Sequence, residues 1–214
     1  MNNLNQAREW MVERQLARRG IHDAYLLDAM RQVPREEFIS PAMRDYAYED
    51  SPLPIEAGQT ISQPYIVALM IEGAQVRPGD RVLEIGAGSG YAAAVMAAIA
   101  HQVYAIERHP ELAELARQRF ARLGYANIEI RIGDGSGGWP EAAPFDAILA
   151  AAGGPEVPDA LRRQLVIGGR LVMPVGSMHS QRLIKTTRQG EDQFSREDLG
   201  GVMFVPLIGE HGWH

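Results

Sequence analysis

The sequence predicts an α/β fold: a doubly wound, mostly parallel sheet with an N-terminal helical cap. Residues 81–100 have the pattern of a buried strand, a glycine turn and a helix, and four more short apolar strands follow before residue 175. Apolar residues at helical spacing dominate the N-terminal quarter instead. The 214 residues fit a single domain, 1–214, with a cap segment over residues 1–75 and a core over residues 76–214.

The N-terminal quarter is expected to contain two helices. Residues 5–19 carry apolar side chains at helical spacing, and Gly20 is a plausible end for this helix. Asp23 is a favourable N-cap for a second helix over residues 24–31, which ends before Pro34. Proline-led turns follow, so this quarter is expected to lie as a cap against the sheet.

The segment after the cap is expected to be mostly extended loop over residues 46–59, because it is rich in proline and glycine. A helix over residues 65–72 follows it. Ser62 stands just before this helix, and two explanations stay open for its hydroxyl. It caps the helix, or it receives a substrate carboxylate together with nearby backbone amides. Both roles can hold at once.

The glycine turn between the first sheet strand and its helix indicates a ligand site. Gly86, Gly88 and Gly90 stand at alternate positions, where glycine allows a tight turn and a close approach of a ligand. A dinucleotide-binding fingerprint would need a further glycine at the position of Tyr91. A nicotinamide dehydrogenase is therefore disfavoured.

Three carboxylates lie at or just after the ends of expected strands. Glu84 precedes the glycine turn, where an acid suits a cationic or hydroxyl-bearing ligand. Glu107 ends a strand over residues 102–107, at the spacing where an acid holds both hydroxyls of a ribose. Asp134 follows a strand over residues 128–132, where an acid can accept from an adenine amino group. Together with the glycine turn, they resemble the S-adenosylmethionine site of class I methyltransferases, which have a Rossmann-like sheet.

The C-terminal half is expected to complete the sheet, with the order of its last strands left open. The expected elements are strands over 145–150 and 170–174, a helix over 159–164 ended by Gly168 and Gly169, a hairpin strand over 181–188, a surface loop over 189–198 and a last strand over 201–207.

Composition and charge exclude several function classes. The net charge of −6 argues against a nucleic-acid partner, which usually needs a basic face. No apolar run is long enough to span a membrane, and the absence of cysteine excludes thiol chemistry. The six histidines lack metal-ligand spacing, although His179 and His211 could border a substrate cleft. We expect a monomeric cytoplasmic protein with no metal, no nucleic acid and no membrane partner.

Five segments resemble those of protein-L-isoaspartate O-methyltransferases. The Gln-Thr-Ile-Ser run, which ends at Ser62, is the most family-specific part. The resemblance covers nearly the whole chain, from about Met11 to Trp213. The five segments are residues 33–38, 50–64, 84–91, 168–176 and 204–209.

The resemblance implies an enzyme that transfers a methyl group from S-adenosyl-L-methionine to the free α-carboxylate of L-isoaspartyl residues in damaged peptides and proteins, leaving S-adenosyl-L-homocysteine. The methyl ester then cyclises to a succinimide, which starts repair. Ser62 is the position assigned to the active site, and we interpret its role as orienting the carboxylate. Thr60 and Ile61 are expected to line the same crevice, between cap and cofactor, and to contribute to cofactor binding.

The resemblance also assigns the cofactor-binding residues. Glu84, with Gly86, Gly88 and Gly90, is expected to surround the methionyl end of the cofactor. Glu107 is expected to hold the ribose. Asp134 and Gly135 are expected to contact the adenine, which completes the predicted set.

Two other functions stay open at this point. A methyltransferase of another small carboxylate or amine would share every cofactor residue and differ only in cap and tail. A non-catalytic adenosyl-binding scaffold would be expected to have substitutions in the glycine turn or at the acids, and the sequence has none there. Methylation assays with matched isoaspartyl and aspartyl peptides separate these functions.

Overall fold

The computed structural model describes residues 4–213 and contains one seven-stranded sheet with the order β5-β4-β3-β6-β7-β8-β9. Residues 1–3 and 214 of the expected domain lie outside the described residues. The first five strands in this order are parallel, and β8 and β9 add antiparallel neighbours. The strands are β3 Arg81–Ile85, β4 Gln102–Glu107, β5 Ile128–Ile132, β6 Phe145–Ala150, β7 Leu165–Ser177, β8 Ser180–Arg188 and β9 Phe194–Val202.

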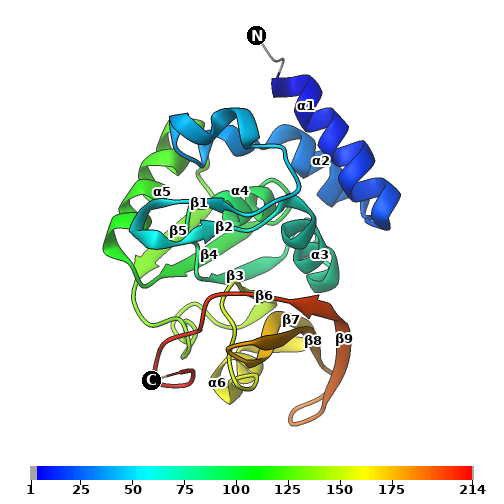
Figure 1. Cartoon of the computed structure of the whole chain (residues 1–214). Coiled ribbons are helices and arrows are strands. Elements are labelled where there is room, and N and C mark those ends of the chain that lie inside the picture. The colour runs from blue at the N-terminus through cyan, green and yellow to red at the C-terminus, as the bar shows by residue number, and fades with distance from the viewer. Residues whose placement is uncertain (1–3, 214) are drawn as a thin grey trace.

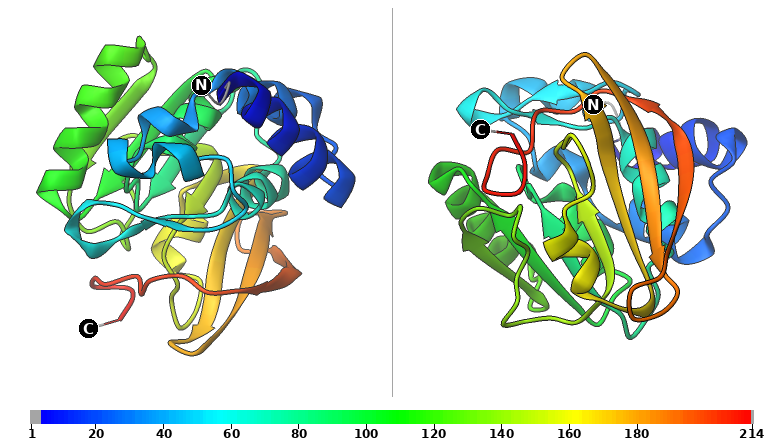
Figure 2. Two further views of the ribbon diagram at one scale, coloured as in Figure 1. Left: turned by 45° about the horizontal axis from the view of Figure 1, so that its top comes forward. Right: turned by 90° about the horizontal axis from the view of Figure 1, so that it is seen from below.

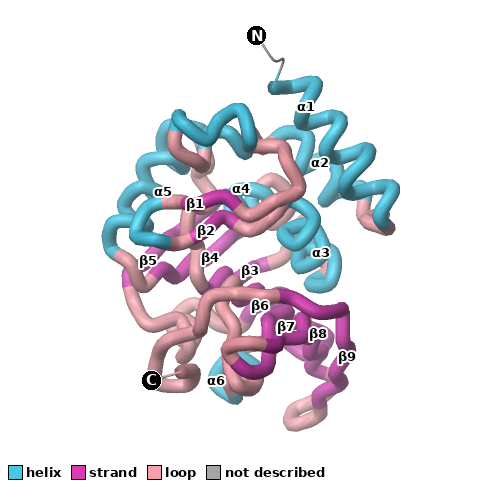
Figure 3. Tube along the Cα trace, viewed as in Figure 1, coloured by secondary structure: helices cyan, strands magenta, loops and turns pink. Residues whose placement is uncertain are grey.

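Helices cover both faces of this sheet, which confirms the predicted fold class (Figure 1). Val82 and Leu83 of β3 are fully buried in two different core clusters, because consecutive side chains of a strand point to opposite faces. The first cluster includes side chains of the cap, α3, α4 and α5, and the second includes those of α6. Figure 3 shows these helices in cyan, with α6 apart from the others. The helices are α3 Pro64–Ala74, α4 Tyr91–Ala97, α5 Pro110–Leu123 and α6 Asp159–Arg163.

The central strand β3 marks the point where the strand order reverses. From β3 the chain continues outward to β4 and β5, and then returns to β6 on the other side of β3. In open α/β sheets a crevice forms at such a point, beyond the carboxyl ends of the strands. The topology therefore places the loops after β3, β4 and β6 around one crevice.

The N-terminal cap is helical, as predicted, but its first helix is not regular. α1 (Leu4–Trp10) continues into a π-helical turn, η1 (Met11–Leu16), and a 3-10 turn, η2 (Ala17–Arg19). Gly20 ends it with φ 98°, in the left-handed region that favours glycine. The Asp23 side chain accepts the N–H of Leu26 at 3.0 Å and so caps α2, Ala24–Gln32.

The segment between the cap and α3 is more ordered than the expected extended loop. After the 3-10 turns η3 (Arg35–Glu37) and η4 (Pro41–Tyr46), the two-residue strand β1 (Leu53–Pro54) pairs antiparallel with β2 (Thr60–Ile61). The turn η5 (Glu56–Gly58) joins them. Such short strands carry no periodicity, so their pairing was not visible in the sequence.

The C-terminal expectations were wrong at three points. α6 ends at Arg163, and Gly168 and Gly169 lie inside the long strand β7 instead of ending the helix. The expected surface loop 189–198 is found only over residues 189–193, because β9 begins at Phe194. The expected last strand 201–207 is wrong, since β9 ends at Val202. β9 is the edge strand, and its polar side chains suit an edge exposed to water.

Residues 203–213 then leave the sheet and turn back across it, which both views of Figure 2 show in red. Within residues 4–213, no helix has the length and apolar character needed to cross a membrane.

Candidate functional site

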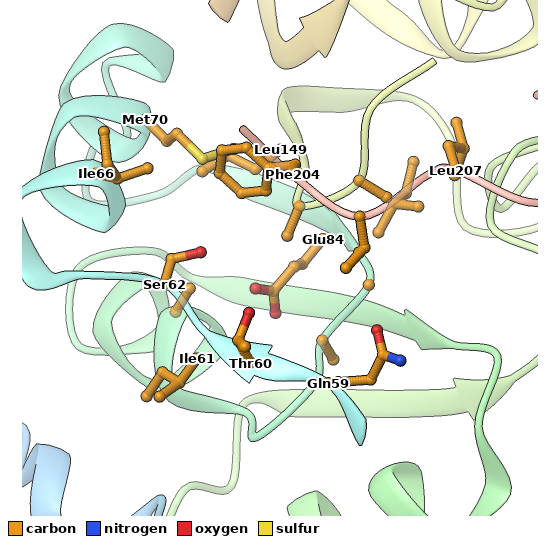
Figure 4. Close-up of a pocket in the computed structure, with 18 of the residues that line it drawn as sticks. Gln59, Thr60, Ile61, Ser62, Ile66, Met70, Glu84, Leu149, Phe204 and Leu207 are labelled. Atoms are coloured by element: carbon orange, nitrogen blue, oxygen red, sulfur yellow. The ribbon is translucent and has the colours of Figure 1, made fainter. Parts of the chain in front are cut away.

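A cavity of ≈ 920 Å³ lies at the carboxyl ends of the central strands. Its lining comes from five places: the glycine turn after β3, the loops after β4 to β6, the segment from β2 into α3, the hairpin between β7 and β8, and the C-terminal segment. Figure 4 shows Ser62, Glu84 and Phe204 on different walls of this pocket. Segments far apart in the sequence therefore meet at the crevice that the strand order predicts.

The glycine turn contributes Gly86 and Gly88 to the lining, but not Gly90. Gly86 has φ 81° and Gly88 has φ 53°, so the turn uses backbone conformations that favour glycine. Gly90 has φ 88°, and a Cβ there would lie 2.7 Å from the ring of Phe120 in α5. Gly90 is therefore needed for the packing of α5 behind the turn.

Glu107 is buried at the end of β4 and fastens the glycine turn. Its Oε2 accepts the N–H of Gly88 at 2.8 Å, and its Oε1 accepts the N–H of His109 at 2.9 Å. Only 4% of the residue is exposed. Each carboxylate oxygen can accept a second hydrogen bond, so the group can hold two hydroxyls at the pocket while it orders the turn.

Glu84 is the least satisfied polar group of the pocket. It is 2% exposed, and its buried Oε2 has no hydrogen-bond partner among the described residues. Burial, and secondly the charge of Glu107, raise the pKa of Glu84 well above its ordinary value, although the backbone amide of Ala93 opposes this. A ligand with a cationic donor at this position would satisfy Oε2, and the ammonium group of S-adenosylmethionine fits this requirement.

The β2 segment forms the opposite wall. Thr60, Ile61 and Ser62 all line the pocket, and Figure 4 shows the hydroxyls of Thr60 and Ser62 on the side that faces Glu84. The N-cap of α3 is Gln63, so the capping explanation of Ser62 is wrong. The hydroxyl of Ser62 is therefore available to a ligand.

The loop after β5 contributes Gly135 to the lining, whereas Asp134 lies outside it. The Asp134 carboxylate accepts the N–H groups of Ser136 and Glu210, each at 2.8 Å. Burial acts to raise the pKa of Asp134, but these hydrogen bonds and the nearby His211 outweigh it, so the pKa is lowered.

The C-terminal segment is the part of the pocket that sequence reasoning missed. Residues 203–208 form one wall, whereas the sequence identifies residues 204–209 only as a family segment without a role. Of the two candidate histidines, His179 lines the pocket and His211 does not. Within residues 4–213, no group of three His, Cys, Asp or Glu side chains could hold a metal ion.

The family model and the sequence relatives that match this chain all name one enzyme family. A model of the protein-L-isoaspartate(D-aspartate) O-methyltransferase family matches residues 6–212. A protein-L-isoaspartate O-methyltransferase 2 of Pelobacter propionicus is 59% identical over 214 residues, which are 100% of this chain and 95% of the relative. A protein-L-isoaspartate O-methyltransferase of Brucella anthropi is 57% identical over 100% of this chain and 98% of the relative.

Solved structures show the same likeness. A protein-L-isoaspartate O-methyltransferase superposes with a TM-score of 0.86 and 32% identity, over 96% of this chain and 67% of that chain. A putative protein-L-isoaspartate O-methyltransferase from Plasmodium falciparum, in complex with S-adenosyl-L-homocysteine, gives a TM-score of 0.82 and 28% identity, over 97% of this chain and 99% of that chain. The chain belongs to the protein-L-isoaspartate(D-aspartate) O-methyltransferase family.

Proposed function

We propose that the chain methylates the free α-carboxylate of L-isoaspartyl residues in damaged peptides and proteins, with S-adenosyl-L-methionine as methyl donor. One observation carries this proposal: a single pocket holds both Ser62 and Glu84, whose buried Oε2 has no hydrogen-bond partner among the described residues. The first suits an acceptor carboxylate, and the second suits a cationic cofactor. The methyl ester then cyclises without the enzyme to a succinimide, which starts the repair.

We propose that Glu84 accepts from the ammonium group of the cofactor, while Glu107 holds the ribose hydroxyls. Gly86 and Gly88 line the pocket and allow the close approach that this requires. Gly135 lines it too, and we propose that it contacts the adenine. Gly90 supports the turn from behind. A contact between Asp134 and adenine stays a prediction, since two backbone amides already occupy its carboxylate.

Methyl transfer to a carboxylate depends on the alignment of the reacting groups and needs no general acid or base. The bound cofactor supplies a methyl group on a sulfonium, whose leaving group is a neutral thioether. The acceptor carboxylate is ionised near pH 7, so no general base is needed. We propose that the Ser62 hydroxyl donates to this carboxylate and orients it. Apolar side chains of the lining, among them Met70 and Phe204, exclude water from it.

Incubation with labelled S-adenosylmethionine and two matched peptides tests the function. One peptide contains an isoaspartyl residue, and the other contains a normal aspartyl residue. We expect label to enter only the isoaspartyl peptide, as a base-labile ester. Equal labelling of both peptides would favour a methyltransferase with a different acceptor. Cofactor binding without labelling of either would favour a non-catalytic scaffold.

We also propose that residues 1–214 form one domain and act as a monomer in the cytoplasm without a nucleic-acid partner. The first core cluster supports the single domain, because it joins Met11 of the cap to Val82 of the sheet. The net charge of −6 supports the absence of a nucleic-acid partner. Size-exclusion chromatography and cell fractionation test the oligomeric state and the location.

A further inference from the structure

The wall formed by residues 203–208, here called the C-terminal wall, spans the pocket without belonging to the sheet. Phe204 packs against the first core cluster, which contains Met70 of α3 and Leu149. Leu207 belongs to the second cluster, on the other face of the sheet. Figure 4 shows Phe204 near Met70 and Leu149, with Leu207 on the far side of Glu84. The position of the C-terminal wall therefore depends on contacts with other parts of the chain.

Gln181 of β8 makes two hydrogen bonds to the backbone of Phe204. Its Nε2 donates to the backbone oxygen of Phe204 at 3.1 Å, and its Oε1 accepts the backbone N–H of Phe204 at 2.8 Å. The backbone pairing of β8 with β9 ends at Gln181 and Val202. A side-chain amide has a donor and an acceptor like a peptide group. Gln181 therefore extends the strand pairing to Phe204 after the backbone ladder has stopped.

Gly153 contacts the side-chain amide of Gln181 and makes backbone hydrogen bonds to the next residues of the C-terminal wall. A Cβ at Gly153 would lie 2.6 Å from Nε2 of Gln181, so the amide rests directly on the glycine. The N–H of Gly153 donates to the oxygen of Val205 at 2.8 Å, and its oxygen accepts the N–H of Leu207 at 2.8 Å. Gln181 also lines the pocket but is only 4% exposed, so its two hydrogen bonds to Phe204 are largely shielded from water.

We propose that Gln181 is a positioning residue for methyl transfer, which holds the backbone of Phe204 so that its side chain closes the pocket beside α3. This inference rests on the proposed function, because Ser62, which immediately precedes the N-cap of α3, is where that function places the acceptor carboxylate. Loss of the two hydrogen bonds should therefore impair binding of the isoaspartyl peptide more than binding of the cofactor.

The chain offers a matched control in Gln164. This residue is also buried, at 9% exposure, and also holds a loop through both ends of its amide. Its Oε1 accepts the N–H of Trp139 at 2.7 Å, and its Nε2 donates to the oxygen of Gly137 at 2.8 Å. Neither of these loop residues lines the pocket. Gln164→Met thus removes a similar pair of hydrogen bonds away from the site.

The experiment compares Gln181→Met with Gln164→Met in the full chain. Methionine keeps the length of the side chain and removes the amide. We expect both variants to lower the melting temperature. Only Gln181→Met should raise the KM for an isoaspartyl peptide, by about tenfold, with the affinity for S-adenosyl-L-homocysteine within about twofold of wild type. A structural role alone would give both variants the same peptide KM as wild type.

Phe204→Ala and the double variant Gln181→Met/Phe204→Ala complete the test. If Gln181 acts through Phe204, Phe204→Ala should also raise the peptide KM, and the double variant should be no worse than Phe204→Ala alone. Additive effects, or an unchanged KM in Phe204→Ala, would overturn the proposal, even if Gln181→Met does not fold. Inactivity of the wild-type protein on isoaspartyl peptides would instead contradict the proposed function.

Discussion

The carboxylate of Asp134 accepts the backbone N–H of Glu210 at 2.8 Å, which joins the loop after β5 to the C-terminal tail. The neighbouring Ser136 strengthens this junction, because its Oγ accepts the N–H of His211 at 3.0 Å. The tail packs so closely here that a Cβ at Gly209 would collide with Asp134. The loop expected at the adenine and the tail that forms the C-terminal wall are thus held together.

This junction gives a prediction for Asp134→Ala. If the carboxylate mainly holds the tail, the variant should lose about 1–2 kcal/mol of stability, since two hydrogen bonds to a partly solvated carboxylate disappear. Binding of S-adenosyl-L-homocysteine should weaken as well. Thermal unfolding and calorimetry measure both effects, with Asp134→Asn as the control that keeps one acceptor oxygen. Weaker binding with an unchanged melting temperature would show instead that Asp134 contacts the adenine directly.

Glu107→Ala should weaken cofactor binding by at least about tenfold for each ribose hydroxyl that loses its charged acceptor. The structure adds a loss of stability, because the Glu107 carboxylate also accepts from Gly88 and His109. Glu107→Gln keeps one oxygen and should lie between wild type and Ala in both properties. Calorimetric titration with S-adenosyl-L-homocysteine and a melting curve on the same preparation test this. Unchanged affinity in a folded variant would remove Glu107 from the site.

Glu84 gives a pH-dependent prediction for the cofactor-free protein. Its raised pKa means that the protonated carboxyl favours the folded state, and that this contribution is lost as the pH rises through the raised pKa. Glu84→Gln stays neutral and should escape this loss. The melting temperature of Glu84→Gln relative to wild type should therefore increase as the pH rises from about 5 to 8. A difference that is independent of pH would show that Glu84 is ionised throughout.

Ser62→Ala should lower the rate of methyl transfer to an isoaspartyl peptide by about ten- to a hundredfold, the expected loss of a hydrogen bond to a charged group. Because Gln63 is the N-cap of α3, the melting temperature should stay close to that of wild type. Cofactor affinity should also be nearly unchanged. Measuring melting and methylation on one preparation checks these expectations. A destabilised variant with full specific activity would refute the orienting role.

Local sequence patterns predicted the central sheet well. The strands expected over 102–107 and 128–132 are present with the same bounds, as β4 and β5. Each has apolar side chains at regular spacing over several residues, and such periodicity is visible in the sequence. The same patterns failed for β9, whose polar side chains resemble those of a loop. An edge strand is defined by its pairing with β8, and pairing depends on residues that are distant in the sequence.

The strand, glycine turn and helix around Gly86 can be predicted from the sequence alone, as can the acids that end the neighbouring strands, because both follow local backbone rules. Which of these groups face the pocket depends on the packing of the whole chain. That packing leaves Oε2 of Glu84 buried with no hydrogen-bond partner among the described residues. It also directs Asp134 toward the tail and places Phe204 at the pocket, hydrogen-bonded to Gln181. A hydrogen bond between distant residues depends on how the chain packs, and no local sequence pattern contains that geometry.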